Sequence, residues 1–348
     1  MGLMKVLVLA YGDGGAASTL YRYRVGEDLW RSKGHELKIV PVGGLSGDFW
    51  REIQRYDAVI NQKALLGGKF LRRLRATGIP LFFDFDDAIW TRPKKPYSWW
   101  TQWKVNSRIR AWFCNVHGVM AANRYLADFA RRFTHSVEVV PMGLDLEIWR
   151  PSSRKSRGKR PRIGWAGNPG NLWHLEKLRE PLRRLSQKRE DIEVAVFSGR
   201  RPSFDFPYEY VPYSQGAECE FVAGLDVGLL PLDSEPYSLG KSPIKALQYM
   251  SCGVAVVGNA AGASAELLDG RNGVVIRSES EWLPALEGIL SVPERLREVG
   301  MAGRRFVEER HDLRKVTEQQ IERLVDQLSD QRARTSLGPA EVRGLRSE

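Results

Sequence analysis

The chain has 348 residues, more than one hydrophobic core usually serves, so its length predicts two domains. Hydrophobic residues make up 43% and charged residues 27%, and no apolar run approaches the roughly 20 residues of a membrane span. The amino-terminal sequence lacks the apolar stretch of a signal peptide, so we expect a cytoplasmic protein. A net charge of +11 indicates an anionic partner, which is nucleic acid, anionic lipid or a phosphorylated small molecule.

The number and spacing of the cysteines and histidines give no support for a disulfide framework or for a metal site built from them. Cys114, Cys219 and Cys252 are odd in number, far apart in sequence and without a CxxC spacing. The five histidines are scattered and form no HExxH pair. The sequence therefore supports neither a disulfide framework nor a zinc site, and we expect no metal and no bound cofactor.

The first half of the chain reads as one α/β domain over residues 1–149. Short apolar runs alternate with amphipathic stretches such as Thr19–Lys33 and Arg124–Phe133, a pattern typical of βαβ units in a parallel, doubly wound sheet. The expected strands are Lys5–Ala10, Glu36–Val40, Ala58–Asn61, Leu81–Asp84, Gly118–Ala121 and Val137–Val140.

A basic, proline-containing segment at 150–162 predicts a linker, after which the strand pattern resumes in a second domain over 163–310. Its expected strands are Arg162–Ala166, Ile192–Phe197, Tyr208–Val211, Val227–Leu230, Val254–Val257 and Val274–Ile276. Long polar helices fill about 279–329, and the aperiodic 330–348 predicts a disordered tail. Two such domains predict a ligand cleft between them, beyond the carboxyl ends of the strands.

The strongest local signal is the segment LGKSPIKALQYMSCG, which covers 239–253. Ser242 is a good N-cap and a proline follows it, so a helix is expected to begin there and to bind an anion at its amino end. Lys241 and Lys245 lie four residues apart and bracket the same place, and Gln248 shares roughly their face. The alternative is an ordinary capped helix with two solvated lysines.

Five segments in order resemble the family 4 glycosyltransferases over roughly residues 4–325: VVPMGLDLEIWRP, RIGWAGNPGN, LDVGLLPL, LGKSPIKALQYMSCG and AAGASAELLDGRNGVVI. The resemblance implies a GT-B fold, which is α/β with two Rossmann-like domains whose parallel sheets face an interdomain cleft. It also implies a retaining, nucleotide-sugar-dependent transferase, and a carboxyl-terminal helix over 311–329 that crosses back to the first domain.

The resemblance assigns donor-binding residues in the second domain. Gln248 and Gly240 stand where the family has two glutamates, so Gln248 is expected at the ribose with one hydrogen bond in place of a carboxylate. Val211 and Tyr213 follow a strand and are expected at the base. The expected ligands of the diphosphate in this domain are Gly167, Asn168, Lys241, Ser242 and Lys245, with Lys245 also expected to stabilise the leaving group.

In the first domain two strand ends carry candidate residues. Gly14 and Gly15 lie in a glycine turn after the first strand and are expected near the diphosphate, although such turns are often merely turns. Asp86 and Asp87 follow the fourth strand and are expected to orient the acceptor hydroxyl or take its proton. The alternatives for these aspartates are helix capping and metal binding.

Residues 92–113 combine six basic residues with four tryptophans and no acid. We expect an acceptor-binding or membrane-binding surface built from Lys94, Lys95, Trp99, Trp100 and Trp103, in peripheral contact with the anionic inner membrane surface. Stacking on single-stranded nucleic acid and packing of the tryptophans into the core are the alternatives.

Together these patterns predict an enzyme that moves a sugar from a nucleoside diphosphate sugar, with UDP or GDP as the nucleotide, to a hydroxyl acceptor. The acceptor is expected to be a glycan, glycolipid or secondary metabolite, and anionic or lipid-linked. The alternatives are a sugar-nucleotide epimerase, a non-catalytic sugar-nucleotide-binding protein of the same fold, and a nucleic-acid-binding protein.

Overall fold

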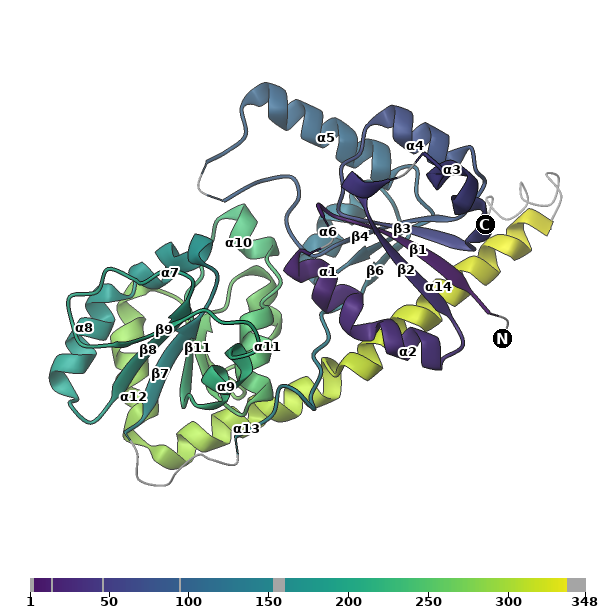
Figure 1. Cartoon of the computed structure of the whole chain (residues 1–348). Coiled ribbons are helices and arrows are strands. Elements are labelled where there is room, and N and C mark those ends of the chain that lie inside the picture. The colour runs from purple at the N-terminus through teal and green to yellow at the C-terminus, as the bar shows by residue number, and fades with distance from the viewer. Residues whose placement is uncertain (1–2, 14, 46, 94, 153–159, 337–348) are drawn as a thin grey trace, which may run out of the picture. The chain divides into compact units, whose positions relative to one another are not determined.

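The structure is a computed structural model that describes residues 3–13, 15–45, 47–93, 95–152 and 160–336, with the backbone alone described over 330–336. The described chain folds into two compact units (Figure 1). Unit 1 combines residues 1–143 with the segment from Leu313 onward, and unit 2 comprises Leu144–Asp312. Of the segment 150–162, residues 153–159 lie outside the described residues, as do 337–348 of the expected tail.

Unit 1 is built on a six-stranded sheet in the order β2-β1-β3-β4-β5-β6. All its strand pairs are parallel, which confirms the predicted doubly wound architecture. The central strands β3 and β4 are buried at every position, as expected where helices cover both faces of a sheet. The strands are β1 Lys5–Ala10, β2 Glu36–Pro41, β3 Ala58–Gln62, β4 Leu81–Phe85, β5 Gly118–Ala121 and β6 Val137–Val139.

Helices cover both faces of this sheet. They are α1 Ala17–Arg22, α2 Glu27–Ser32, α3 Phe49–Glu52, α4 Gly68–Arg75, α5 Trp99–Phe113, α6 Arg124–Arg131 and α14 Leu313–Ser336. Short 3-10 turns occur at η1 Arg24–Gly26, η2 Val42–Gly44 and η3 Ile53–Arg55. The expectation of one helix over Thr19–Lys33 is wrong, because the backbone of Tyr23, at φ −136° and ψ −54°, interrupts it.

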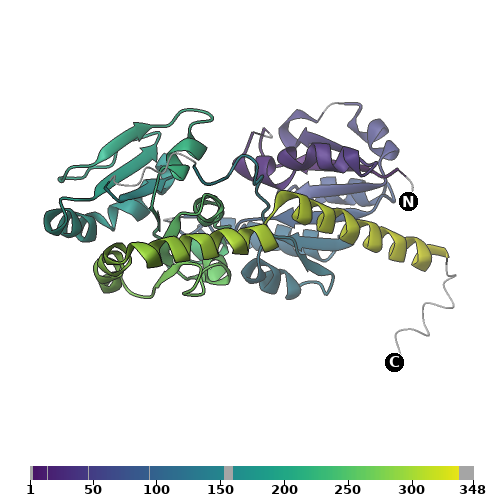
Figure 2. The same ribbon diagram turned by 90° about the horizontal axis from the view of Figure 1, so that it is seen from below.

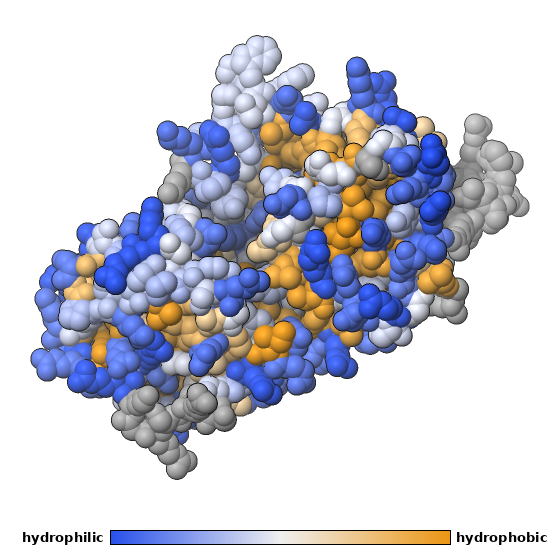
Figure 3. Space-filling view, viewed as in Figure 1, coloured by the Kyte–Doolittle hydropathy of each residue, from blue (hydrophilic) through white to orange (hydrophobic). Residues whose placement is uncertain are grey.

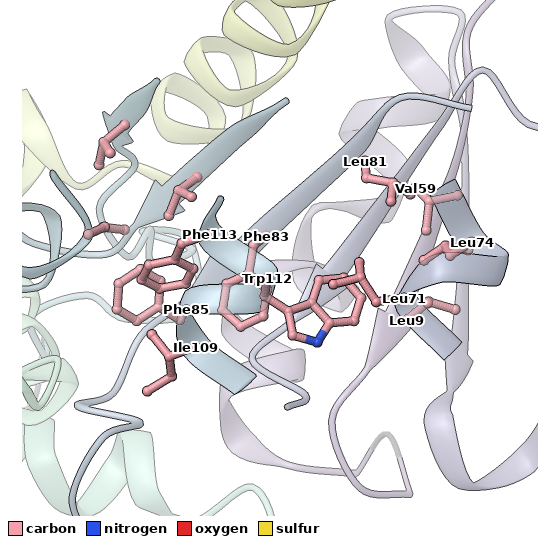
Figure 4. Close-up of a cluster of buried hydrophobic side chains, with 14 of the residues drawn as sticks. Leu9, Val59, Leu71, Leu74, Leu81, Phe83, Phe85, Ile109, Trp112 and Phe113 are labelled. Atoms are coloured by element: carbon pink, nitrogen blue, oxygen red, sulfur yellow. The ribbon is translucent and has the colours of Figure 1, made fainter. Parts of the chain in front are cut away.

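An aromatic cluster forms the core on one face of the unit 1 sheet (Figure 4). Phe83 of β4 lies 5.7 Å from the ring of Trp112 and 5.1 Å from that of Phe113, both near the end of α5. The Trp112 Nε1 donates a hydrogen bond to the carbonyl of Leu66, so the polar edge of this buried ring is satisfied. The second half of α5 is therefore anchored in the core.

The last helix, α14, lies across the other face of the same sheet (Figure 2). Val316, Ile321, Leu324 and Leu328 pack there with side chains from β1, β3, β4 and β5. At Gly26 an added Cβ would lie 3.0 Å from the Thr317 hydroxyl, so this part of α14 also passes close to η1. The helix continues to Ser336 rather than ending near residue 329.

Unit 2 has a second sheet of six parallel strands in the order β12-β11-β10-β7-β8-β9. Its strands are β7 Arg162–Ala166, β8 Glu193–Ser198, β9 Glu209–Pro212, β10 Val227–Leu230, β11 Ala255–Asn259 and β12 Val274–Ile276. Its helices are α7 Leu172–Glu176, α8 Arg179–Lys188, α9 Glu218–Ala223, α10 Pro236–Gly240, α11 Ile244–Ser251, α12 Trp282–Ser291 and α13 Pro293–Arg310. Three 3-10 turns are η4 Pro169–Asn171, η5 Gly262–Glu266 and η6 Glu279–Glu281.

Candidate active site

The strand order of each sheet indicates at which of its strands a ligand is expected to bind. In unit 1 the chain changes direction at β1, which lies between β2 and β3, and in unit 2 at β7, which lies between β8 and β10. In open parallel sheets, ligands bind beyond the carboxyl ends of the strands at such switch points. Ligands are therefore expected at the segments that follow β1, β3, β7 and β10.

In unit 2, the turn after β7 is tightly built. The Gly167 amide donates to the Phe197 carbonyl at 3.0 Å, and an added Cβ at Gly167 would lie 2.3 Å from the Trp165 ring. The Asn168 side chain accepts a hydrogen bond from the Gly170 amide at 2.8 Å and so caps η4. Both residues thus lie at the switch point. The backbone amide of Gly167 and the side-chain oxygen Oδ1 of Asn168 form hydrogen bonds that stabilise the turn.

The lysines of the predicted donor segment lie on two consecutive helices. Lys241 ends the short α10, which the sequence did not predict, and Lys245 lies in the first turn of α11. The prediction that Ser242 caps this helix is wrong, because Pro243 occupies the N-cap position and no side chain caps the helix. The Ser242 carbonyl instead accepts a hydrogen bond from the amide of Ile244.

The Lys245 ammonium is half-buried and forms an ion pair with the Glu218 carboxylate of α9. The exposed fractions of the two side chains are 27% and 22%, so solvent reaches both. An anion that binds Lys245 must share it with Glu218 or displace that carboxylate. The sequence did not predict this partner, since Glu218 is distant in the chain.

The remainder of α11 is buried and anchored to the sheet. The Tyr249 hydroxyl accepts a hydrogen bond from the Ala166 amide at 2.8 Å, at the end of β7, and burial raises the pKa of this phenol. Gln248 has no exposed surface, so in this conformation it offers no atom to a ribose. Gly228 of β10 is needed here, because a Cβ would lie 2.4 Å from the Tyr249 ring. The anchor holds the first turn of α11 in a fixed relation to β7.

The residues expected at the base lie at the edge strand β9. Val211 is half-buried in β9, where it pairs with Phe197. Tyr213 follows the strand; the residue is 61% exposed, and its ring lies edge-on to that of Phe197. Of the two, Tyr213 offers an aromatic surface on which a base can stack.

A charged group that the sequence reading missed lies beside the same switch point. His174 of α7 is buried, and its Nδ1 lies 3.9 Å from the carboxylate of Asp233, which follows β10. The Lys177 ammonium lies 3.8 Å from that carboxylate. Asp233 comes three residues after a strand that was predicted, and this position was the signal that could have found it.

In unit 1, the carboxyl ends of β3 and β4 bring three charged side chains together. The Lys63 Nζ lies 2.9 Å from Asp86 Oδ1 and 2.5 Å from Asp87 Oδ2. Asp86 and Lys63 are almost fully buried, whereas 29% of the Asp87 side chain is exposed. The ring of Tyr11, after β1, lies 5.6 Å from the Lys63 ammonium, so three strand ends meet here.

Lys63 has a special backbone conformation. Its φ of +44° is the one positive φ at a non-glycine residue in the described part of the chain. Its amide donates to the Asp84 carbonyl at 2.7 Å, which holds the residue at the end of β3. Strained residues of this kind cluster at functional sites, and sequence reasoning had no signal for this one.

The surroundings shift the acidity of this group. Burial, and then the negative charge of Asp87, raise the pKa of Asp86 to about 6, against the opposing effects of Lys63 and Arg22. Burial alone lowers the pKa of Lys63, but the two carboxylates more than offset this and raise it. Lys63 therefore stays charged, and the pKa of Asp86 lies closer to neutral pH than that of an ordinary aspartate, as a candidate general base requires.

Asp84, the first aspartate of the run, has a structural role. It forms a buried ion pair with Arg22 of α1, whose Nε donates to Asp84 Oδ2 at 2.8 Å. The Tyr23 hydroxyl donates to the same oxygen at 2.8 Å, and Arg22 also donates to the Val140 carbonyl at 2.8 Å. This network ties α1 to the ends of β4 and β6, and leaves Asp86 and Asp87 as the candidates for chemistry.

The glycine turn after β1 is partly outside the described residues, which exclude Gly14. The Gly15 amide donates to the Asp13 carboxylate at 2.8 Å. This bond closes the turn locally and engages the backbone amide of Gly15, a residue expected from the sequence to lie near the diphosphate. Gly12, at φ +65°, supplies the left-handed conformation at the start of the turn.

The first half of α5 is exposed, and its pale side chains project at the top of the view in Figure 3. Trp99, Trp100 and Trp103 are 64–68% exposed, and the rings of Trp99 and Trp100 stack 3.8 Å apart. Packing into the core, the alternative weighed for these tryptophans, holds for Trp112 alone. Lys95 is also exposed, and Lys94 lies outside the described residues.

The described residues contain neither a candidate membrane span nor a candidate metal-ion cluster. None of the helices there is long and apolar enough to cross a bilayer. No group of three or more histidine, cysteine, aspartate or glutamate side chains is arranged there to hold a metal ion.

Comparison with known proteins identifies the fold. Residues 179–322 match the family model described as Glycosyl transferase-like. Sucrose-phosphate synthase from Thermosynechococcus elongatus matches with a TM-score of 0.73 at 14% identity, over 94% of this chain and 99% of that one. HepE from Anabaena, solved with UDP-glucose, matches with a TM-score of 0.71 at 14% identity, over 93% and 100%. A glycosyltransferase from Rickettsia africae matches with a TM-score of 0.73 at 12% identity, over 94% and 99%.

No curated protein matched this sequence. The structural matches nevertheless cover nearly the whole of this chain, and the family match covers most of unit 2, including α11. The chain thus has the GT-B fold of glycosyltransferases, as the sequence predicted, and residues 179–322 of unit 2 are similar to the Glycosyl transferase-like family model.

Proposed function

We propose that this protein transfers a sugar from a nucleoside diphosphate sugar to a hydroxyl group of an acceptor. The observation that carries the proposal is the GT-B fold with a glycosyl transferase-like domain, in which the half-buried Lys245 lies at the first turn of α11. The fold restricts the class of reaction, and the lysine supplies the charge that a diphosphate leaving group requires.

The donor binds to unit 2 in this proposal, with its diphosphate at the start of α11. Lys245, Lys241 and the backbone near Ser242 neutralise the phosphates, assisted by the amide dipoles at the helix start. The base stacks on the exposed ring of Tyr213. HepE was solved with UDP and with UDP-glucose, which favours UDP as the nucleotide to test first.

At the proposed donor site, the diphosphate and the Glu218 carboxylate compete for the Lys245 ammonium. Without a ligand, Glu218 balances its charge. A diphosphate carries more negative charge than one carboxylate, so it competes effectively for the ammonium and repels Glu218. The lysines replace a metal ion in this scheme, and no divalent cation is required.

Asp86 is the proposed base that accepts the proton of the acceptor hydroxyl. The bond from the anomeric carbon to the phosphate oxygen breaks, and the nucleotide diphosphate leaves with that electron pair. The acceptor oxygen bonds to the anomeric carbon, and its proton passes to the Asp86 carboxylate. Lys63 and Asp87 hold this carboxylate and set its basicity. The resemblance to family 4 enzymes adds retention of configuration to the proposal, which NMR assignment of the product anomer tests.

UDP binding to single-site variants tests the donor site. We expect calorimetry to show UDP binding to the wild-type protein and at least about tenfold weaker binding to Lys245→Ala, the loss of roughly one charge-assisted contact. Lys188→Ala is the matched control, because Lys188 of α8 also pairs with a glutamate in unit 2 but its side chain is 60% exposed. Equal affinities of the wild-type and Lys245→Ala proteins would refute the assignment of the diphosphate to α11.

The exposed start of α5 is the proposed contact with the membrane that carries a lipid-linked acceptor. Trp99, Trp100 and Trp103 are exposed, and Lys95 and Lys104 are exposed beside them. Tryptophan rings suit the headgroup region, and lysines suit its negative charge. We expect binding to vesicles containing phosphatidylserine, with weaker binding when the three tryptophans become alanine. Retention of the triple variant on vesicles at the wild-type level would count against this surface.

A second candidate function is that of a sugar-nucleotide-binding protein without transferase activity. Gly240 and Gln248 favour it, because they occupy the positions of two glutamates in family 4 enzymes. Gly240 supplies no side chain, and Gln248 is buried. Release of UDP from UDP-sugars, with and without acceptor mixtures, separates the two. Binding without release would establish this second candidate.

A further inference from the structure

Two cysteines that are far apart in sequence meet in unit 2. Cys219 is half-buried in the first turn of α9, and Cys252 is fully buried at the end of α11. Helices α9 and α11 pack against each other and are joined by the Glu218–Lys245 ion pair, and the Cys252 thiol lies close enough to Cys219 to act as its hydrogen-bond partner. The number and spacing of the cysteines in the sequence gave no support for a disulfide framework, whereas the fold brings these two close together.

The surroundings of Cys219 favour its reactive form. The thiol hydrogen bond from Cys252 lowers the pKa of Cys219 to about 7, helped by the Arg150 amide and charge and opposed by burial and Glu218. The protonated thiol donates to the Ile148 carbonyl at 2.9 Å. A thiolate near neutral pH is the nucleophile in thiol oxidation, and Cys219 is the member of the pair that solvent reaches.

We propose that Cys219 and Cys252 form a redox-sensitive pair that peroxide converts to a disulfide. The Cys219 thiolate attacks one oxygen of hydrogen peroxide, which gives a sulfenic acid and hydroxide. The Cys252 sulfur then attacks the oxidised sulfur, its proton and the leaving hydroxide forming water, and the S–S bond closes. Peroxide is reduced and the two thiols are oxidised, and a dithiol reductant reverses the step.

The position of the pair gives the bond a consequence for the donor site, and this part rests on the proposed function. Glu218, which precedes Cys219, is the partner of Lys245 on α11. A disulfide between α9 and the end of α11 fixes the two helices together, and so holds Glu218 against the lysine. The diphosphate then competes with a carboxylate that cannot move away, so oxidation weakens donor binding.

Mass spectrometry of the full chain tests the pair. The background is Cys114→Ala, because Cys114 is exposed in unit 1 and would react on its own. After peroxide treatment we expect this protein to lose the mass of two hydrogens and to show a peptide cross-link between Cys219 and Cys252, reversed by dithiothreitol. Cys219→Ser in the same background keeps a residue of similar size at the less buried position and should show no such loss. The absence of the cross-link in the Cys114→Ala protein would overturn the proposal.

UDP titration of the reduced and oxidised proteins tests the link to the donor site. We expect affinity about fivefold weaker after oxidation, within the usual range of coupling between sites, and no change in the Cys219→Ser variant. If the cross-link forms and UDP affinity stays constant, the regulatory role is refuted. If UDP binds to neither form, the proposed function fails, and the mass measurement still decides whether the pair exists.

Discussion

The pKa of Asp86 provides a sharp prediction, because two neighbouring charges shift it in opposite directions. Lys63→Met removes the ammonium 2.9 Å from Asp86 Oδ1 and should raise the pKa of Asp86. Asp87→Asn removes the negative charge that disfavours ionisation and should lower it. The two substitutions therefore predict opposite changes at one carboxyl group.

The magnitudes follow from the unsubstituted value. With a pKa of about 6, the Asp86 carboxylate is about 90% ionised at pH 7 and about 10% ionised at pH 5. Since the proposed base acts in its ionised form, transfer should fall about tenfold between these pH values. Removal of an opposite charge in close contact changes a pKa by about 1–3 units, so Lys63→Met should move the acid limb of the pH–rate profile above neutrality.

Carboxyl carbon NMR of protein with labelled aspartate measures the effect directly, and Asp86→Asn identifies the resonance. Donor turnover between pH 5 and pH 9 supplies the functional profile. Lys5→Met is the matched control, because Lys5 belongs to an exposed ion pair with Glu36 in the same unit. This substitution should leave unchanged both the NMR titration midpoint of Asp86 and the midpoint of the pH–rate profile. A Lys63→Met midpoint at or below that of the wild type would refute the electrostatic account of Asp86.

Three further predictions concern stability and metal dependence. Arg22→Met should lower the free energy of unfolding by about 3–5 kcal/mol in urea titrations, because a buried carboxylate loses its partner, whereas Arg31→Met, from an exposed ion pair, should cost less than about 1 kcal/mol. Gly262→Ala should destabilise the protein more than Gly216→Ala, since both have positive φ but the Cβ at Gly262 alone would lie 2.0 Å from the Leu239 carbonyl; thermal unfolding compares them. EDTA should leave UDP affinity unchanged in calorimetry, and a tenfold loss would contradict the lysine-based site.

The fold was largely predictable because buried parallel strands leave a continuous apolar signal. The strands at 5–10, 118–121, 162–166, 227–230 and 274–276 begin and end where the apolar runs predicted. The single helix predicted over 19–33 does not form, because the backbone leaves the helical conformation at Tyr23. The ring hydroxyl of Tyr23 binds the buried Asp84, and that bond has no signature in the local sequence.

The candidate site was predictable only where its residues follow a recognisable strand. Asp86 and Asp87 were found for that reason, but Lys63 was not. Its contact with them depends on the register of β3 with β4, in which Gln62 pairs with Asp84. The same holds for Glu218, whose contact with α11 comes from helix packing far along the chain.

The way in which α14 completes unit 1 has a consequence for the order of folding. The sheet of unit 1 is synthesised before unit 2, but Val316, Ile321 and Leu324, which cover one of its faces, leave the ribosome after the whole of unit 2. Unit 2 is contained between residues 144 and 312, so its chain is complete before that of unit 1. During translation, the apolar surface around Val6 and Val8 therefore stays exposed until α14 has been synthesised. Nascent chains released before that point expose this surface, and we expect chaperones to bind them.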